Sequence, residues 1–230
     1  MLEILGKIPE KFYLACSGGT DSMAFLDFLM KYPKNKITIL HFDHGTNYCK
    51  EAHEFMYQFC IEHKLSFVIE SIHPQDKKQK DESWEVYWRR CRYNFLSKFK
   101  DKPILMCHQL NDCIETWIMS SMTGNPHLIP YYNKKYNIIR PFLCVSKSQV
   151  NDWRKRHNVK CVIDGSNYDV RMKRNFVRHV MMQDIYKLNP GIEKTIRRQI
   201  IHEYDELKHI NILLDNYEKQ EQKGIVKSGD

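Results

Sequence analysis

A glycine-rich loop near the start of the chain restricts the possible folds more than any other feature of the sequence. The loop, residues 16–22, reads Cys-Ser-Gly-Gly-Thr-Asp-Ser; an apolar run at 12–15 precedes it and an apolar-periodic segment at 23–30 follows it. This order predicts a strand, a tight turn and a helix, because glycines let backbone N–H groups converge without a Cβ in the way. The helix N-terminus adds free N–H groups and a partial positive charge. Three hydroxyl side chains add donors: Ser17, Thr20 and Ser22. The loop therefore predicts an anion socket for a phosphate or a pyrophosphate.

The loop contains Asp21 and has no lysine after its glycines, which distinguishes it from the common nucleotide loop G-x-x-x-x-G-K-[ST]. A carboxylate beside phosphate groups needs a metal ion or an amine to offset its charge. The alternative is an ordinary serine and glycine turn in which Asp21 caps the helix.

Size and composition are typical of a soluble globular protein. The 230 residues are enough for one sizeable domain, or for one domain with a helical appendage, and 42% are hydrophobic and 28% charged. No run of 18 apolar residues occurs and the first residues do not resemble a secretory signal, so we expect no membrane span and a cytoplasmic protein. The eight cysteines are scattered and include no C-x-x-C pair, which predicts reduced thiols and disfavours a zinc or iron–sulfur site.

The chain is basic, with 36 Lys and Arg against 28 acidic residues and a formal net charge of +8. The basic residues gather in three clusters: Arg89, Arg90 and Arg92; Arg171, Lys173, Arg174, Arg178 and His179; and Lys194, Arg197 and Arg198. Aromatic residues lie near them in the sequence, among them Trp84, Trp88 and Tyr168. Arginine with aromatic neighbours suits the RNA backbone and unstacked bases, and the alternative is a solvated basic face.

Apolar runs alternate with segments of helical spacing along most of the chain. Strands are predicted at residues 12–15, 36–42, 66–72, 103–108 and 138–142, with an edge strand at 160–164. Helices are predicted at 23–30, 49–63 and 84–99, from Asn111 or Asp112 to about Met122, at 146–157 with a serine cap, and from Asn175 onward. A lysine-rich and mobile loop is expected at 73–81. This order predicts an α/β fold with a doubly wound, parallel, Rossmann-like sheet and right-handed crossovers.

The C-terminal part of the chain is expected to be helical. In this interpretation residues 1–185 form the α/β domain, and residues 186–222 form a helical extension that Asn189-Pro190-Gly191 interrupts. Its long amphipathic helix runs to about Gln220, and its apolar stripe suits packing within the chain or in a homodimer. We expect the tail, residues 223–230, to be disordered.

Polar residues follow two of the predicted strands, as the glycine loop follows the first. His41, Phe42 and Asp43 end the second strand, and Cys107 and His108 end the fourth. Because ligands in such sheets bind outside the carboxyl ends of the strands, these groups are expected to line one rim with the loop. Backbone groups near His41 and Phe42 would contact adenine or ribose, and Asp43 would face the reacting centre. The alternative is that these residues only begin loops.

Two carboxylates stand at the start of the helix that follows this rim. Asp112 and Glu115 are three residues apart and so share a helix face. The helix dipole favours acids there, which is the structural alternative. Beside a phosphate socket, however, two acids repel an anion unless they hold Mg²⁺ or a substrate ammonium group. We therefore favour a functional role for both.

Two pairs of arginines lie at helical spacing. Arg89 and Arg92 share one helix face, where fixed guanidinium groups would bind phosphate or stabilise charge that grows on it. Surface salt bridges are the alternative for this pair. Arg174 and Arg178 are four residues apart and would contact RNA phosphates or the nucleotide.

Taken together and in this order, the motifs resemble those of one family of PP-loop ATP pyrophosphatases, the tRNA(Ile)-lysidine synthetases. The similarity runs from about Phe12 to Pro190. The motifs are Ser17-Gly18-Gly19-x-Asp21-Ser22, His41-x-Asp43-His44-Gly45, Arg89-x-x-Arg92-Tyr93, His108-x-x-x-Asp112-x-x-Glu115-Thr116, Arg140-Pro141, Asp164-x-Ser166-Asn167 and Arg174-Asn175-x-x-Arg178. The resemblance implies a PP-loop catalytic domain over residues 1–185.

The resemblance implies a ligase that uses ATP, Mg²⁺, free L-lysine and an isoleucine tRNA with a CAU anticodon. The C2 carbonyl oxygen of the wobble cytidine attacks the α-phosphate and releases pyrophosphate. The ε-amine of lysine then attacks C2 and releases AMP, which leaves lysidine. Asp43 is our candidate for removing a proton from the amine, which must be neutral to attack.

The resemblance also implies a role for each matching residue. The ATP contacts are Ala15, Cys16, Ser17, Gly18, Gly19, Thr20, Asp21, Ser22, His41, Phe42, Cys107 and His108. The catalytic residues are Asp43, Arg89, Asp112 and Glu115, and the metal ligands are Asp21 and Asp112. The tRNA contacts are Arg92, Arg174, Asn175 and Arg178.

The chain departs from the pattern of this family at several positions. Thr46 and Asn47 stand where leucine and arginine are usual, Cys113 replaces a glutamine, and Trp88 replaces a small residue. Many members carry further C-terminal domains that help to grip the tRNA. For this chain there are three alternatives. The terminal helix and the basic face are sufficient to bind the tRNA, a dimer supplies the further contacts, or tRNA selection is relaxed.

Three other functions remain open from the sequence. They are a tRNA 2-thiolation enzyme of the PP-loop group, a non-catalytic RNA-binding relative, and a small-molecule ligase of the amidotransferase type. The lack of C-x-x-C pairs disfavours the first and the lack of an evident glutaminase domain disfavours the third. Four acids near a bound RNA disfavour the second: Asp21, Asp43, Asp112 and Glu115.

Overall fold

A six-stranded sheet forms the centre of the protein. The computed structural model describes residues 2–45, 47–73, 75–163 and 165–227, with side chains except at 47–49, 166, 167 and 211–227. The strands are β1 (Lys11–Ala15), β2 (Lys36–Asp43), β3 (Ser66–Ser71), β4 (Ile104–Met106), β5 (Tyr132–Asn133) and β6 (Ile138–Ile139). Their order is β3-β2-β1-β4-β6-β5, and all pairings are parallel except that of β5 with β6. The predicted doubly wound parallel sheet is thereby confirmed.

The strand order reverses beside β1. The chain runs outward from β1 to β2 and β3, and then crosses back to place β4 on the other side of β1. Leu14 of β1 consequently lies between Ile39 of β2 and Leu105 of β4. In such sheets, ligands bind in the crevice where the strand order reverses, outside the carboxyl ends. The glycine loop follows β1 and Cys107 follows β4, so both flank this crevice.

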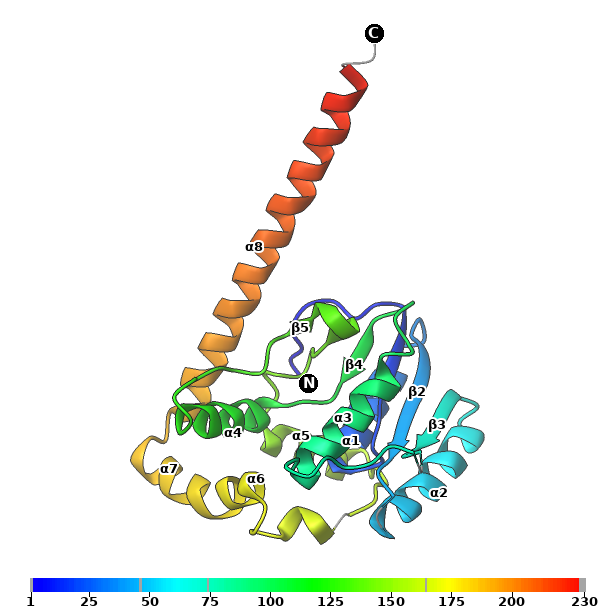
Figure 1. Cartoon of the computed structure of the whole chain (residues 1–230), viewed down its shortest axis with the longest axis vertical. Coiled ribbons are helices and arrows are strands. Elements are labelled where there is room, and N and C mark those ends of the chain that lie inside the picture. The colour runs from blue at the N-terminus through cyan, green and yellow to red at the C-terminus, as the bar shows by residue number, and fades with distance from the viewer. Residues whose placement is uncertain (1, 46, 74, 164, 228–230) are drawn as a thin grey trace.

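Helices pack on both faces of the sheet (Figure 1). They are α1 (Thr20–Met30), α2 (Asn47–Glu62), α3 (Trp84–Leu96), α4 (Leu110–Ser121), α5 (Lys147–Arg156), α6 (Lys173–Phe176), α7 (Met182–Leu188) and α8 (Ile192–Lys227). Successive side chains of β1 point to opposite faces: Phe12 and Leu14 pack with α1, α2 and α5, whereas Tyr13 packs with α3. The buried strands are apolar on both faces for this reason.

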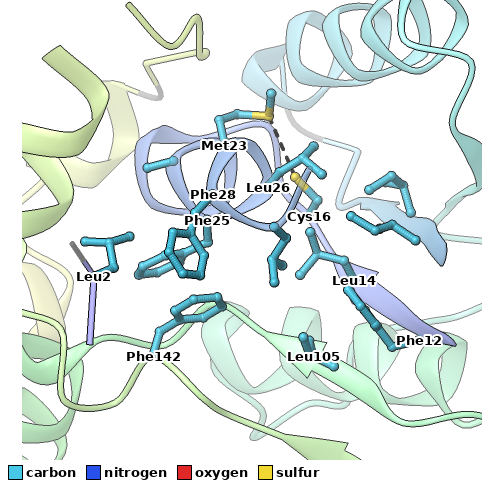
Figure 2. Packing of buried hydrophobic residues seen from close by; sticks show 14 of the residues in the cluster. Leu2, Phe12, Leu14, Cys16, Met23, Phe25, Leu26, Phe28, Leu105 and Phe142 are labelled. Carbon is cyan, nitrogen blue, oxygen red and sulfur yellow. Dashed lines mark hydrogen bonds between the residues drawn. The ribbon is translucent and has the colours of Figure 1, made fainter. Parts of the chain in front are cut away.

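The core layer on the α1 side extends up to the glycine loop. Phe25 of α1 stacks on Phe142 with ring centroids 3.9 Å apart, and both rings are fully buried. Figure 2 shows Cys16 in the same layer, with its sulfur 3.7 Å from that of Met23. The Cys16 side chain therefore belongs to the core, and this residue offers only its backbone to the crevice.

Two short segments differ from the prediction. Residues 160–163 do not form a strand, and Asp164 lies outside the described residues. Val162 instead donates its backbone N–H to the Gly18 carbonyl oxygen, 2.9 Å away, so this segment supports the glycine loop and not the sheet edge. The edge strands are β3 and β5, and β5 has only two residues, which is too short for period-two alternation to reveal it.

The segment from Asn175 is helical as predicted, but it is not one regular helix. It begins two residues earlier with α6 and passes through a π-helix, Val177–Met181, before α7 starts. A π-helical turn changes the direction of the side chains around it and often occurs at functional sites. Here it includes Arg178, which reaches α4.

The long helix α8 projects from the domain as a single rod (Figure 1). Its first turns pack against α4 through buried isoleucines: Ile192, Ile196 and Ile200. It continues to Lys227, beyond the predicted end near Gln220, so the start of the predicted disordered tail is helical; residues 228–230 lie outside the described residues. A homodimer through α8 stays a prediction. Within the described ranges, no helix has the length and apolar character needed to cross a membrane.

Candidate active site

The glycine loop forms an open turn at the carboxyl end of β1. Gly18 has a φ of +80°, a backbone conformation that favours glycine, and a Cβ there would lie 3.2 Å from the Met56 side chain, which would have to shift slightly. Gly19 is the N-cap of α1 and makes no side-chain cap hydrogen bond. The first N–H groups of a helix have no partner within the helix. Those of Thr20 and Asp21 are therefore available to an anion.

Hydrogen bonds hold this turn in shape from within the loop. The hydroxyl oxygens of Ser17 and Ser22 are 3.1 Å apart, and the Ser22 hydroxyl also donates to the Gly19 carbonyl oxygen at 3.1 Å. The Val162 N–H also donates to the Gly18 carbonyl oxygen, so hydrogen bonds hold both glycines of the turn in place. It is therefore preorganised for its ligand.

Lys147 supplies the positive charge that Asp21 requires. Its ammonium group forms an ion pair with the Asp21 carboxylate and lies 3.4 Å from the Thr20 hydroxyl. The Lys147 backbone N–H donates to the side-chain carbonyl of Asn111 at 2.9 Å, which ties α5 to α4. Asp21 does not cap α1, because Gly19 is the N-cap and α1 has no side-chain cap. The alternative of a capping Asp21 is therefore wrong.

The sequence predicts an amine or a metal beside Asp21 but does not identify Lys147. The available signal was the helix cap at Ser146, which accepts the Gln149 N–H as predicted. A helix that begins at the rim places its first-turn side chains there. Nothing in the sequence, however, indicates that α5 begins beside α1.

His41 and Asp43 border the crevice from β2. The Nδ1 atom of His41 donates to the Cys16 carbonyl oxygen at 2.9 Å, and burial lowers the pKa of the ring. The neutral ring keeps Nε2 as a buried acceptor with no partner among the described residues. Asp43 is 8% exposed and accepts the Gly45 N–H at 2.7 Å. In the described part of the chain no lysine or arginine pairs with it; His53 Nδ1 lies 3.9 Å away.

The neighbours of Asp43 have other roles. The Phe42 ring stacks on the Phe95 ring in the core, with centroids 5.4 Å apart. Only the backbone of Phe42 is therefore available to a ligand. His44 lies between Phe42 and Trp88, with ring centroids 5.1 and 6.1 Å away. Burial, assisted by the charge of Arg92, lowers the pKa of His44 to about 4. His44 is therefore uncharged near neutral pH.

His108 lies among arginines at the end of β4. Burial lowers its pKa well below the usual value, and the charges of Arg140, Arg92, Arg174 and Arg89 lower it further. His108 Nδ1 and Arg92 Nε are buried without a partner in the described ranges. Buried donors of this kind are usually satisfied, and a charged donor binds most strongly to an anion. The crevice thus has a second group suited to phosphate.

Cys107 lies between the glycine loop and α4. Its thiol is 3.7 Å from the Ala15 carbonyl oxygen. Burial raises the pKa of this thiol well above its usual value, and the charges of Cys16, Asp21 and Asp112 raise it further. The carboxylates of Asp21 on α1 and Asp112 on α4 therefore both lie near the Cys107 thiol.

Asp112 has a structural role at the start of α4. Its carboxylate accepts the Gln109 backbone N–H at 3.0 Å, and the Gln109 side chain accepts the Asn111 N–H at 2.7 Å. These two bonds form a capping box, and α4 begins at Leu110, slightly before the predicted start. Burial raises the pKa of Asp112, and the charge of Arg174 opposes the shift. Stabilisation of the start of α4 is therefore one role of Asp112, as the structural alternative proposed.

Glu115 is 1% exposed and lies between two arginines. Arg174 Nε donates to one of its oxygens at 2.9 Å, and Arg178 donates to both oxygens at 2.7 and 2.8 Å. Arg178 also donates to Asp112 at 3.1 Å. Burial opposes the charge of Arg178, but the hydrogen bonds to Glu115 outweigh it and raise the arginine pKa. Two acids of α4 and two arginines of the C-terminal segment thus form one network.

The expected RNA-binding arginines therefore point toward the acids of α4. Their side chains keep 29% and 33% exposure, so each still has an accessible edge. Asn175 donates to the Asp169 carbonyl oxygen at 3.1 Å and holds the turn before α6. Arg89 is exposed and contacts Tyr93, with its guanidinium 4.7 Å from the ring centroid. The structure thus brings Arg174 and Arg178 to Asp112 and Glu115 but leaves Arg89 outside this network.

The two acids proposed for a metal ion, Asp21 and Asp112, both lie near Cys107. Among the described residues, no group of three or more His, Cys, Asp or Glu side chains could hold a metal ion. Asp21 and Asp112 already pair with Lys147 and Arg178. Magnesium in nucleotide sites commonly uses one or two carboxylates together with phosphates and water, and two acids meet that requirement.

Comparisons with known proteins show the family of the chain. A family model described as a PP-loop domain matches residues 3–185. The tRNA(Ile)-lysidine synthase of Thermotoga maritima is 31% identical over 202 residues, which are 83% of this chain and 49% of that protein. The same enzyme of Buchnera aphidicola is 28% identical over 224 residues, 92% of this chain and 50% of that protein. The chain thus spans about half the length of these curated relatives. The structure of an NH₃-dependent NAD synthetase from Campylobacter jejuni aligns with a TM-score of 0.44 at 14% identity, over 87% of this chain and 86% of that chain.

Proposed function

Because this chain belongs to the PP-loop domain family, we propose that it binds ATP at the glycine loop and uses it in a ligase reaction. In this proposal the chain converts the wobble cytidine of an isoleucine tRNA with a CAU anticodon to lysidine, with free L-lysine as the second substrate. One observation carries the proposal. The glycine loop follows β1, the ion-pair network begins on α4 after β4, and the strand order reverses between these two strands.

The glycine loop is proposed to hold the pyrophosphate part of ATP. The N–H groups at the start of α1 and the ammonium group of Lys147 would contact its oxygens, and Arg92 would offer its buried Nε donor. These groups place positive charge where negative charge grows as the bond to the α-phosphorus breaks. His41 would offer its Nε2 acceptor to the adenosine part, near the Phe42 backbone.

The chemistry proposed has two substitutions. The C2 carbonyl oxygen of cytidine forms a bond to the α-phosphorus as the bond to pyrophosphate breaks. The ε-nitrogen of lysine then bonds to C2, loses a proton, and AMP departs with the former carbonyl oxygen. Asp43 suits the role of proton acceptor, because it is buried and no lysine or arginine of the described residues pairs with it.

The network around Glu115 suits the binding of a free amino acid. Lysine has two ammonium groups and a carboxylate at neutral pH, and this network has both carboxylate and guanidinium groups. Asp112 and Glu115 would accept from an ammonium group, and the accessible edges of Arg174 and Arg178 would bind the lysine carboxylate or an RNA phosphate. Mg²⁺, where it accompanies ATP, would neutralise phosphate charge beside Asp21 and Asp112.

The cysteines of the site argue against the thiolation alternative. A sulfur-transferring thiol must be accessible as a thiolate, and burial raises the pKa of both Cys16 and Cys107. The described cysteines are all free, and at the site Cys16 is buried and Cys107 is partly buried. The site therefore favours adenylation followed by attack of an amine.

Transfer of lysine to RNA tests the proposal directly. With ATP and labelled lysine, the protein is expected to label a tRNA with a CAU anticodon and to leave unlabelled one in which uridine replaces the wobble cytidine. Uridine has a C2 carbonyl too, so the comparison also tests base selection. Equal labelling of both RNAs, or labelling of neither, would contradict the assignment.

Replacement of Lys147 by methionine is expected to weaken ATP binding roughly 10- to 150-fold, the range for loss of a hydrogen bond to a charged group. The change removes the partner of Asp21 and leaves a carboxylate beside the phosphates. Isothermal titration with a non-hydrolysable ATP analogue measures the effect. Lys155→Met, on the exposed side of the same helix, is the matched control. An unchanged affinity in Lys147→Met would show that this amine does not contact the nucleotide.

A further inference from the structure

Two tryptophans form an aromatic surface that the proposed chemistry does not use. We call Trp84 and Trp88, on the first two turns of α3, the tryptophan ledge. Their ring centroids are 5.7 Å apart, and the Tyr87 ring lies 5.8 Å from that of Trp84. Trp84 is 56% exposed, whereas Trp88 is partly buried and Tyr87 is buried. Trp84 thus offers an exposed indole face beside a partly buried one, and such a face is a platform on which a nucleobase stacks.

The ledge borders the crevice. Helix α3 follows β3, and helices that follow parallel strands begin near the carboxyl edge of the sheet. The Trp88 ring centroid is 6.1 Å from that of His44, which follows Asp43 at the end of β2. A molecule that lies across the ledge would therefore extend toward the proposed proton acceptor.

The loop before α3 is folded onto this helix, in contrast to the mobile loop expected from the sequence. Arg90 binds Glu82 through two donors at 2.9 and 2.8 Å, and these hydrogen bonds lower the pKa of Glu82 to about 2. The Tyr87 hydroxyl donates to the Asp76 carbonyl oxygen. The loop thereby places the Lys78 ammonium group 5.6 Å from the centroid of the Trp84 ring.

The chemistry of the ledge fits an unpaired nucleobase. Indole rings stack on any base, and a nearby cation is compatible with the phosphate that accompanies the base. The charges around the ledge are mixed, because exposed Asp81 and Glu85 lie on the same segment as Lys77, Lys78 and Lys80. Stacking, and not phosphate contact, is therefore the main interaction that this surface offers.

We propose that the tryptophan ledge stacks an unpaired base of the substrate RNA next to the nucleotide that enters the crevice. The partner is a single-stranded loop, since bases in a duplex are already stacked on each other. This inference rests on the proposed function for its substrate. The binding of a loop to the ledge can nevertheless be measured without turnover.

Trp84→Ala tests the ledge, because alanine is a good helix former and Trp84 is exposed at the helix start. We expect it to weaken binding of a CAU anticodon stem-loop roughly 5- to 150-fold, which corresponds to the loss of one base stack. The slope of log affinity against log salt should not change, because no phosphate contact is lost. Trp84→Phe should retain most of the affinity. Tyr32→Ala removes another exposed aromatic after α1, away from the ledge, and should have no effect.

The probes are the stem-loop and a fully paired RNA of equal length. Quenching of tryptophan fluorescence by the stem-loop in the wild type, and its reduction in Trp84→Ala, would support the ledge. Equal affinities of wild type and Trp84→Ala, or an equal loss for the paired RNA, would overturn it. If the wild type binds the stem-loop through Trp84 but transfers no lysine, the proposed function fails and the ledge stands. If lysine is transferred and Trp84→Ala has the wild-type affinity, only the ledge fails.

Discussion

Replacing Asp43 by asparagine is expected to slow lysine transfer by about 10²- to 10⁴-fold, the range for loss of a general base. Asparagine retains the oxygen that accepts the Gly45 N–H at 2.7 Å, so the turn after β2 keeps its shape. It cannot take up the proton that the ε-amine must lose. ATP binding should be unchanged, because the glycine loop and Lys147 are unaffected. Single-turnover transfer of labelled lysine to a CAU tRNA gives the rate.

The control for this change is Asp184→Asn. Asp184 is an exposed aspartate of α7 that pairs with Lys187, and its replacement should leave the transfer rate unaltered. A near-wild-type rate in Asp43→Asn would remove Asp43 from the proton transfer. A fall in ATP affinity that accounts for the whole loss would assign it to nucleotide binding.

Replacing Glu115 by alanine is expected to lower the free energy of unfolding by about 3 kcal/mol and to abolish lysine transfer. Removal of one partner from a buried ion pair leaves uncompensated charge, here on Arg174, while Arg178 keeps Asp112 as a partner. The cost falls at the lower end of the range for such pairs, because the two arginine side chains keep 29% and 33% exposure. Urea denaturation followed by circular dichroism measures it.

A second substitution separates charge from packing. In the Glu115→Ala background, Arg174→Met removes the guanidinium that has lost its carboxylate partner and should recover part of the stability without restoring transfer. A Glu115→Ala protein as stable as the wild type would show that the network contributes little to folding.

Replacing Asp112 by alanine is expected to lower the free energy of unfolding by about 1 kcal/mol through loss of the helix cap, in addition to the loss of its ion pair with Arg178. Urea denaturation of Asp112→Ala measures this loss, and a stability equal to that of the wild type would contradict the structural role of Asp112.

The fold could be predicted from the sequence because its signals are local. The strands β1 to β4 are apolar runs, and the glycine loop indicates the turn between β1 and α1. The serine cap at Ser146 placed the start of α5 correctly. Elements without a local pattern were missed: β5 has two residues, and the π-helix at Val177–Met181 has no sequence signature.

The partners of the site residues could not be predicted, because they depend on long-range packing. Asp21 and Lys147 are 126 residues apart in the sequence, and Glu115 and Arg178 are 63 apart. Motif spacing places residues on a helix face but does not show which helix lies opposite. The arginines expected to reach RNA therefore proved to face Glu115, and the lysine-rich loop proved to be held by Arg90.

The products formed from ATP test the central claim most directly. Protein supplied with ATP, lysine and a CAU tRNA is expected to release AMP and pyrophosphate in amounts equal to the lysine incorporated. Thin-layer separation of ATP labelled in the α-phosphate distinguishes AMP from ADP. Accumulation of ADP, or no nucleotide turnover with all three substrates present, would contradict the assignment of the glycine loop to a pyrophosphate leaving group.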